Sequence, residues 1–258
     1  MMEPIRQGSR FALCNQFCSR GAASRRRGVE KIVVVLSGGV DSATLLYDLH
    51  HRGHSLKCLS FDYGQRHRRE IDSARQLAGR VDCAHVEVDL TSLAPLLANN
   101  SLSGRDLEIP DGHYAEESMK QTVVPNRNMI MLSIAIGWAI DLEFDAVAYG
   151  AHGGDHAIYP DCRPEFADAM STAAGLCDWR SIQLRRPFIN LDKGQIVRRG
   201  YELGVPFELT WTCYKGGQRH CGKCGACHER KEAFATQGLR DPVPYDEDPA
   251  PTGENAAQ

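Results

Sequence analysis

The 258-residue sequence has no long uninterrupted apolar segment and no large excess of charge of one sign. Its most apolar stretch, around 129–140, is broken by Ser133, Gly137 and Trp138, so we expect no membrane span. A net charge of −3 at pH 7 argues against a general nucleic-acid binder. A secretory signal is also lacking, which predicts a cytoplasmic protein with reduced thiols, although it has ten cysteines.

The two ends of the chain differ in composition from its middle. Residues 1–29 contain six arginines and a single acidic residue, Glu3. Organellar transit segments have this composition, but we favour the simpler interpretation of a disordered N-terminal extension. Residues 238–258 are rich in proline and acidic residues, which predicts a disordered tail.

Between the ends, apolar β-branched runs alternate with helical patterns. We expect strands at 31–36, 55–63, 83–90, 144–150 and 181–188, and helices at 41–51, 65–80, 126–142, 163–176 and 192–204. Residues 91–122 read as an irregular insertion or lid. This alternation predicts an α/β fold with a Rossmann-like parallel sheet covered on both faces, which binds ligands at the carboxyl ends of its strands.

The string "LSGGVDS" (36–42) follows the first predicted strand and opens a helix. Gly38 and Gly39 allow a ligand to approach the backbone closely, and the N–H groups of the turn and first helical turn favour an anion. The string does not match the phosphate loop with G-x-x-x-x-G-K-[ST], because no lysine follows the glycines. A tight strand–helix turn without function is the alternative.

The complete string resembles the PP-loop of ATP pyrophosphatases, which cleave ATP to AMP and pyrophosphate. The resemblance implies an ATP site in which Asp41 contacts Mg²⁺, an ion that prefers carboxylate and phosphate oxygens. The ATP-binding residues that we expect are Leu36, Ser37, Gly38, Gly39, Val40, Asp41, Ser42, Ala43, Thr44, Leu45 and Leu46 in the loop and helix, with Asp62 and Tyr63 after the second strand.

Five motifs together resemble the 7-cyano-7-deazaguanine synthases of queuosine biosynthesis. They are "SGGVDS", "FDYGQRH" (61–67), "VPNRN" (124–128), "HGGDHAIYPDCRPEF" (152–166) and "CYKGG…HCGKCGAC" (213–227), and the resemblance covers about 30–237. One departure is Asn126, where we expect glycine; asparagine tolerates a left-handed backbone, so the turn should survive.

The resemblance implies a C–N bond-forming ligase with the fold of adenine nucleotide alpha hydrolases. ATP adenylates the carboxylate of 7-carboxy-7-deazaguanine, ammonia gives the amide, and a second activation gives the nitrile. The expected units are an ATP-binding domain at 30–209 and a zinc module with a terminal helix at 210–237. A homodimer is also implied.

The same resemblance assigns roles to single residues. Ser37, Asp41 and Ser42 hold pyrophosphate and metal, Lys193 contacts the ATP phosphates, and Arg127 contacts the nucleotide or the phosphorus transition state. The alternative for Lys193 is a solvated side chain in a first helical turn, where the helix dipole disfavours a cation.

The deazaguanine pocket is assigned to "YPDCR" (159–163). Tyr159 would stack on the base, Asp161 would pair with its N1–H and amine, and Arg163 would bind its carboxylate; turn and salt-bridge roles are the alternatives. Cys162 is expected to line the pocket rather than act as a nucleophile. The role of Asp155 and His156 is left open: they bind a metal or act as a base, or they only form part of the loop structure.

Cys213, Cys221, Cys224 and Cys227 are spaced C-x₇-C-x₂-C-x₂-C. This spacing suits a tetrahedral Cys₄ zinc site, although ferredoxin-like iron–sulfur clusters also use C-x₂-C steps. We favour zinc, because the reaction transfers no electrons. Four thiolates leave no open position, so the ion would be structural. The runner-up function is another PP-loop enzyme, either a tRNA thiolase or a ligase joining a deazaguanine to an amine.

Overall fold

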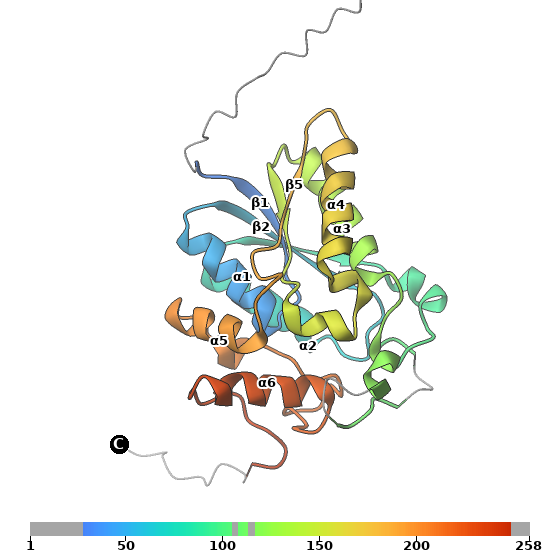
Figure 1. Cartoon of the computed structure of the whole chain (residues 1–258), viewed down its shortest axis with the longest axis vertical. Helices are drawn as coiled ribbons and strands as arrows, with labels where there is room; N and C mark the ends of the chain where they lie inside the picture. Colours follow the sequence, from blue (N-terminus) through green and yellow to red (C-terminus); the bar gives the residue numbers. More distant parts are fainter. Residues whose placement is uncertain (1–27, 105–107, 113–116, 249–258) are drawn as a thin grey trace, which may run out of the picture.

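The computed structural model describes residues 28–104, 108–112 and 117–248. Its centre is a parallel sheet of β1 (Lys31–Val35), β2 (Ser55–Asp62), β3 (Ala84–Asp89), β4 (Ala146–Ala148) and β5 (Gln183–Arg185), in the order β3-β2-β1-β4-β5 (Figure 1). All four strand pairs are parallel. The sequence-based prediction of a parallel α/β sheet is therefore confirmed.

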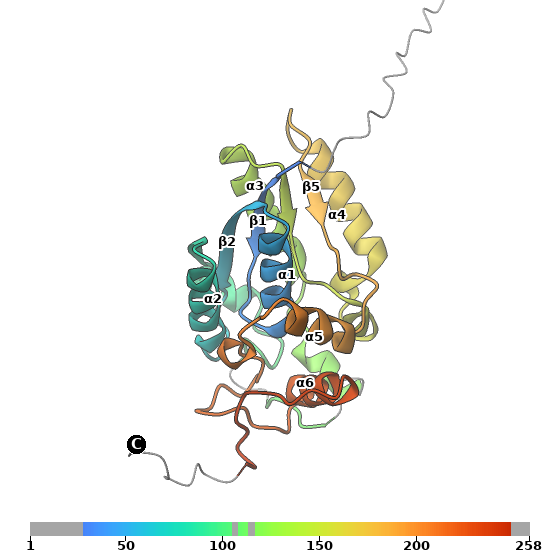
Figure 2. The same ribbon diagram turned by 90° about the vertical axis from the view of Figure 1, so that its left-hand side faces the viewer.

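Helices cover both faces of this sheet (Figures 1 and 2). The helices are α1 (Val40–His51), α2 (Arg69–Arg80), α3 (Arg127–Asp141), α4 (Pro164–Leu176), α5 (Lys193–Glu202) and α6 (Gly225–Thr236). Val33 points to a core shared with α3 and α4, whereas Ile32 and Val34 point to a core shared with α1, α2 and α5. Alternate β1 residues thus enter opposite cores, as the side-chain period of a strand requires.

The strand order reverses at β1. The chain proceeds from β1 to β2 and β3 on one side, then crosses to β4 and β5 on the other. Ligands of open parallel sheets bind outside the carboxyl ends of the strands at this reversal. The loop 36–39 leaves β1 at that point, so the fold places "LSGGVDS" where a nucleotide is expected.

Several element boundaries differ from the sequence prediction, and β4 and β5 are both shorter than the predicted 144–150 and 181–188. α2 begins at Arg69 rather than at 65, because "GQRH" forms an irregular turn after β2. The predicted insertion contains two short 3₁₀-helices, η1 (Thr91–Leu96) and η2 (Glu117–Thr122). Three further 3₁₀ segments are η3 (Gly153–Ala157), η4 (Pro160–Cys162) and η5 (Phe207–Leu209), and the first two of these replace a plain loop before α4.

The stretch Met119–Asp141 is long and apolar enough, with a mean hydropathy of 1.2, to cross a membrane by length and composition. It includes α3, whose Leu132, Ala135 and Ala139 are buried in the core beside the sheet. Core helices of globular proteins pass the same test, and the packing of α3 against the sheet accounts for its apolar face.

The C-terminal region corrects the expectation of a tail that is disordered from 238 onward. Val243 and Tyr245 are buried beside the cysteine cluster. The fully buried Arg230 of α6 donates to both carboxylate oxygens of Asp241, at 2.8 and 2.9 Å. This pair fixes the segment after α6, because a buried guanidinium needs a charged partner. Residues 1–27 and 249–258, which carry the rest of the disorder predictions, lie outside the described residues.

Candidate nucleotide site and metal centre

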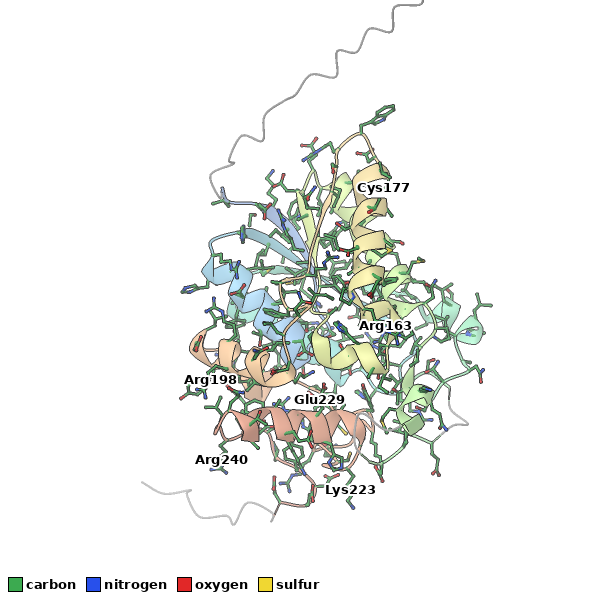
Figure 3. All side chains as sticks on the ribbon, in the orientation of Figure 1. Arg163, Cys177, Arg198, Lys223, Glu229 and Arg240 are labelled. Carbon is green, nitrogen blue, oxygen red and sulfur yellow. The ribbon has the colours of Figure 1, made fainter. Side chains whose placement is uncertain are left out.

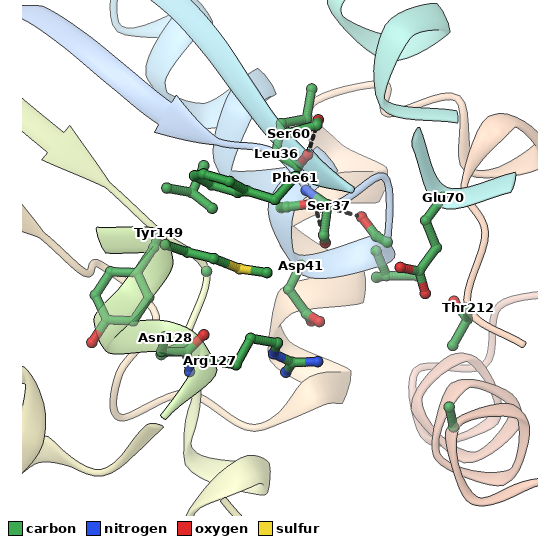
Figure 4. Close-up of a pocket in the computed structure, with 18 of the residues that line it drawn as sticks. Leu36, Ser37, Asp41, Ser60, Phe61, Glu70, Arg127, Asn128, Tyr149 and Thr212 are labelled. Atoms are coloured by element: carbon green, nitrogen blue, oxygen red, sulfur yellow. Dashed lines mark hydrogen bonds between the residues drawn. The ribbon is translucent and has the colours of Figure 1, made fainter. Parts of the chain in front are cut away.

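Two serine hydroxyl groups make hydrogen bonds within the loop between β1 and α1. Ser42 Oγ accepts from the Ser37 N–H at 3.2 Å, and the two serine Oγ atoms are 3.0 Å apart (Figure 4). Ser42 Oγ also donates to the Gly39 carbonyl at 3.2 Å. Gly39 is the N-cap of α1 without a side-chain cap, so the first N–H groups of the helix are available to an anion.

Gly38 is required by the close packing of α2. Its φ is +84°, and a Cβ at this position would lie 2.1 Å from the Glu70 carbonyl oxygen and 2.9 Å from the Ala74 nitrogen. Both atoms are backbone and cannot move aside. Only glycine therefore fits where the loop passes under α2.

One ammonium group links three parts of the chain at this loop. Lys193 Nζ, at the start of α5, lies 2.6 Å from Asp41 Oδ2 and 3.2 Å from Glu229 Oε2 of α6. Burial alone would raise the pKa of Asp41, but the charge of Lys193, with a smaller contribution from His152, holds it below its usual value. Burial would lower the pKa of Lys193, and Asp41, then Glu229, raise it instead. The lysine is therefore charged at neutral pH.

His152 lies beside two carboxylates at this loop. It is fully buried, and its Nδ1 accepts from the Gly154 N–H at 3.1 Å. A neutral ring that accepts at Nδ1 carries its proton on Nε2. That nitrogen lies 3.4 Å from Asp155 Oδ2 and 3.8 Å from Asp41 Oδ2. His152, Asp155 and Glu229 are spaced closely enough to surround a metal ion, but this tautomer gives His152 the role of orienting carboxylates.

A cavity opens between the loop, β2, α3 and the segment before α6. Ser37, Asp41, Arg127 and Lys193 line it, together with Tyr63, Glu70, Tyr149, Asp155, Tyr159, Trp211, Thr212, Tyr214 and Glu229. Figure 4 shows the Arg127 side chain entering the cavity near Asp41. Two cations and the open N-terminus of α1 thus face one space, which suits the phosphates of a nucleotide.

Four cysteines form a second centre at the start of α6. Cys213, Cys221, Cys224 and Cys227 are buried, and their Sγ atoms all lie within 4.8 Å of one another. The Cys221 and Cys227 sulfurs are 3.9 Å apart. Tetrahedral coordination with metal–sulfur bonds of about 2.3 Å requires about 3.8 Å between sulfurs. The cluster therefore fits a four-coordinate metal ion.

Backbone N–H groups support thiolates in this cluster. Cys221 N–H points to Cys213 Sγ at 3.4 Å, and Cys224 N–H points to Cys221 Sγ at 3.3 Å. His220 is not a ligand, because its Nε2 accepts from the Thr212 N–H at 3.2 Å and its ring lies against Trp211. The ligand set is thus complete with four sulfurs.

Comparison with known proteins identifies the family. The family model for "Queuosine biosynthesis protein QueC" matches residues 31–238, which include both the loop "LSGGVDS" (36–42) and all four cysteines of the cluster. The chain belongs to the QueC family. Proteins named "7-cyano-7-deazaguanine synthase" are 52% identical over 216 residues in Methanoregula boonei and 50% identical over 216 residues in Hahella chejuensis. Each alignment covers 84% of this chain, with 99% and 93% of those proteins.

Within this QueC-family chain, the structure brings most of the predicted site residues together. Leu36, Ser37, Gly39, Val40, Asp41, Ser42, Tyr63, Arg127, Tyr159 and Lys193 line the cavity. Ala43, Thr44, Leu45 and Leu46 are buried within α1 behind the loop. Asp62 turns away from the cavity lining, because it accepts from Gly64 N–H and pairs with Arg68 at 2.8 Å.

Two of the residues predicted to bind the base stand elsewhere. Asp161 accepts from the Asn128 N–H at 3.0 Å, which caps the first turn of α3, and it is outside the cavity lining. Arg163 is exposed at the start of α4 and donates to the His156 carbonyl at 2.8 Å (Figure 3). Asn126 has the left-handed φ of 58° that its position requires, so the departure from glycine preserves the turn.

Sequence reasoning missed several residues that line the cavity or face its carboxylates. Glu229, two residues after the last cysteine, lies on the side of α6 toward the sheet (Figure 3). Glu70 follows "GQRH" in the first turn of α2, and His152 opens the "HGGDH" motif. The position of Glu229 in the sequence, two residues after a predicted metal ligand, is the signal that could have identified it. Nothing in the sequence distinguishes Glu70 from the acidic residues common in first helical turns.

Proposed function

We propose that this protein converts 7-carboxy-7-deazaguanine to 7-cyano-7-deazaguanine with ATP, Mg²⁺ and ammonia. The family match over residues 31–238, with a cavity at the loop 36–42 that Arg127 and Lys193 line, carries this proposal. Carboxylate oxygen is a poor leaving group, so adenylation must precede each attack or elimination. The chain's contribution is then to position the reactants and stabilise charge rather than to form a covalent intermediate.

The charges around the loop support a role for magnesium. Asp41, Asp155 and Glu229 carry three negative charges, and Lys193 supplies one positive charge. A polyphosphate would add further negative charge to this space. A divalent cation held by the carboxylates and phosphate oxygens would offset that excess, and Mg²⁺ prefers these ligands. When it is bound, Mg²⁺ would neutralise part of the negative charge of the phosphates.

We propose zinc as the ion of the cysteine cluster, in a structural role. Four sulfurs complete a tetrahedral shell and leave no position for water or substrate. The remaining proposals are a cytoplasmic location and a homodimer. Light scattering of the purified protein tests the homodimer. In the proposed reaction the ammonia comes from solution, and nucleic acid and membranes have no part.

The direct test is incubation of purified protein with 7-carboxy-7-deazaguanine, ATP, Mg²⁺ and ammonium, followed by mass spectrometry. We expect the cyano base, and no cyano base from a Ser37→Ala, Asp41→Ala double variant. Absence of product from metal-replete wild-type protein contradicts the proposal.

The thiolase alternative needs a reactive cysteine at the cavity. Cys162 is the cysteine nearest in sequence to the predicted pocket, but it is outside the cavity lining. Burial, followed by the charges of Asp155 and Asp161, raises the pKa of Cys162 above its usual value. A thiol that remains protonated is a poor nucleophile, which favours the nitrile synthase.

A further inference from the structure

The proposed reaction, on which this inference rests, requires a proton acceptor. Ammonia in neutral solution is almost entirely ammonium, whose nitrogen has no lone pair. Ammonium must lose a proton before its nitrogen can attack an acyl adenylate. A group in the cavity with an available lone pair and a suitable pKa would perform this step.

Most carboxyl groups of the cavity are engaged. Asp41 and Glu229 both contact the Lys193 ammonium, and Asp155 lies beside the donor nitrogen of His152. The Glu70 carboxyl differs, since it lines the cavity and makes no hydrogen bond or ion pair with any residue that the structure describes. Its two oxygens are therefore available to a ligand.

The backbone of α2 fixes Glu70 next to the phosphate loop. The Glu70 carbonyl is the nearest atom to the position of a Gly38 Cβ. The same cavity is lined by Ser37 of the loop and by Arg127 of α3. Figure 4 shows the Glu70 side chain extending from α2 beside Thr212, on the side of the cavity away from Asn128 and Tyr149. The carboxyl group thus faces the same cavity as the loop and the Arg127 guanidinium.

We propose that Glu70 is the catalytic proton acceptor for the attacking nitrogen. The Glu70 carboxylate takes one proton from ammonium, and the freed lone pair forms the C–N bond at the acyl carbon. The bond from that carbon to the adenylate oxygen breaks, and AMP leaves with the electron pair. Glu70 passes its proton to solvent, and the strongly acidic nitrogen of the new C–N bond loses its surplus proton to water, which leaves a neutral amide.

The electrostatics of the site agree with this role. Burial raises the pKa of Glu70 to about 7, while Arg127 opposes the rise and Cys213 adds to it. The Tyr63 hydroxyl also interacts electrostatically with Glu70. The acceptor form is therefore the deprotonated one, present above about pH 7 and lost as the pH falls. A pKa near the working pH is what an efficient general base requires.

The decisive experiment compares two nucleophiles. Hydroxylamine is already uncharged at neutral pH, so it can attack the adenylate without a proton acceptor for a cation. We expect Glu70→Gln to slow product formation from ammonium about 100-fold, the usual contribution of general base catalysis. Hydroxamate formation from hydroxylamine should stay close to the wild-type rate. Asp72→Asn is the matched control, because Asp72 is exposed on the same helix and bonds to Arg75.

The other outcomes separate the possible failures. Equal loss with both nucleophiles places Glu70 in adenylation or folding and overturns the proposal, as does full activity with ammonium. Glu70→Asp, which keeps a carboxyl group, should retain part of the ammonium reaction and its rise through about pH 7. No product from the wild-type protein with either nucleophile contradicts the proposed function itself.

Discussion

Lys193 Nζ lies 2.6 Å from Asp41 Oδ2, across 152 positions of sequence. The contact joins the first turn of α1 to the first turn of α5 on the same side of the sheet. The lysine sits at a helix N-terminus, where the dipole disfavours a cation. Two carboxylates offset that cost, and contact of Lys193 with the ATP phosphates stays a prediction.

Replacing Lys193 with methionine should abolish the ATP-dependent activity and lower the free energy of unfolding. Asp41 and Glu229 would be left close together without a counter-charge, which costs about 3 kcal/mol in the free energy of unfolding. The deficit should shrink as the pH falls into the usual range of carboxyl pKa values, because protonated carboxyls need no counter-charge. Chemical denaturation at several pH values measures this, with the exposed Lys31→Met as control. A deficit that is independent of pH would argue against the ion pair.

Gly38→Ala and Gly53→Ala separate backbone strain from steric conflict. Both glycines have a left-handed φ, of 84° and 79°, but a Cβ at Gly53 meets nothing within 4 Å. We expect Gly53→Ala to cost about 1 kcal/mol, the penalty of a left-handed alanine. Gly38→Ala should cost more and abolish ATP binding measured by calorimetry. Equal effects of the two changes would contradict the close packing of α2 on the loop.

Cys224→Ser should lose the metal and the fold together. Structural zinc contributes roughly 10–16 kcal/mol of apparent binding free energy in small modules. Metal content measured by mass spectrometry and the thermal unfolding temperature should both fall. Cys177→Ser is the control, because Cys177 is exposed and far from the cluster in the sequence. Retention of one equivalent of metal with normal unfolding would rule out the proposed ligand set.

Asp241→Asn should loosen the segment that follows α6. Asp241 accepts from the buried Arg230 and from the Tyr245 hydroxyl, and its loss leaves the guanidinium uncompensated. We expect a loss of about 3 kcal/mol in unfolding free energy. Hydrogen exchange of residues 238–248 should rise. Asp246→Asn, an exposed change in the same segment, should have little effect.

The sequence was most informative where structure is local. The strand, turn and helix around Ser37 and Asp41 lie within one short segment, so their pattern predicts their geometry. Asp161 and Arg163, which we predicted to bind the base, contact Asn128 and the His156 carbonyl instead of lining the cavity, and their role in binding the base stays a prediction. Side-chain direction in such loops depends on tertiary contacts that no local pattern encodes.

Residues 238–248 show the same limitation of local sequence patterns for a whole segment. Proline and acidic residues favour disorder, yet residues 238–248 are ordered by the buried Arg230. Glu70 and Glu229 were missed because each joins the cavity through the packing of a whole helix. In each case a single distant contact outweighs the local composition.

The cysteine cluster and the nucleotide cavity share α6. Cys227 and Glu229 lie in its first two turns, so the helix that supplies a sulfur ligand also supplies the carboxylate that faces Lys193. A metal at the cysteines and a nucleotide at the loop would therefore both act on α6. By thermodynamic reciprocity, whatever such a metal adds to nucleotide affinity the nucleotide would add to metal affinity.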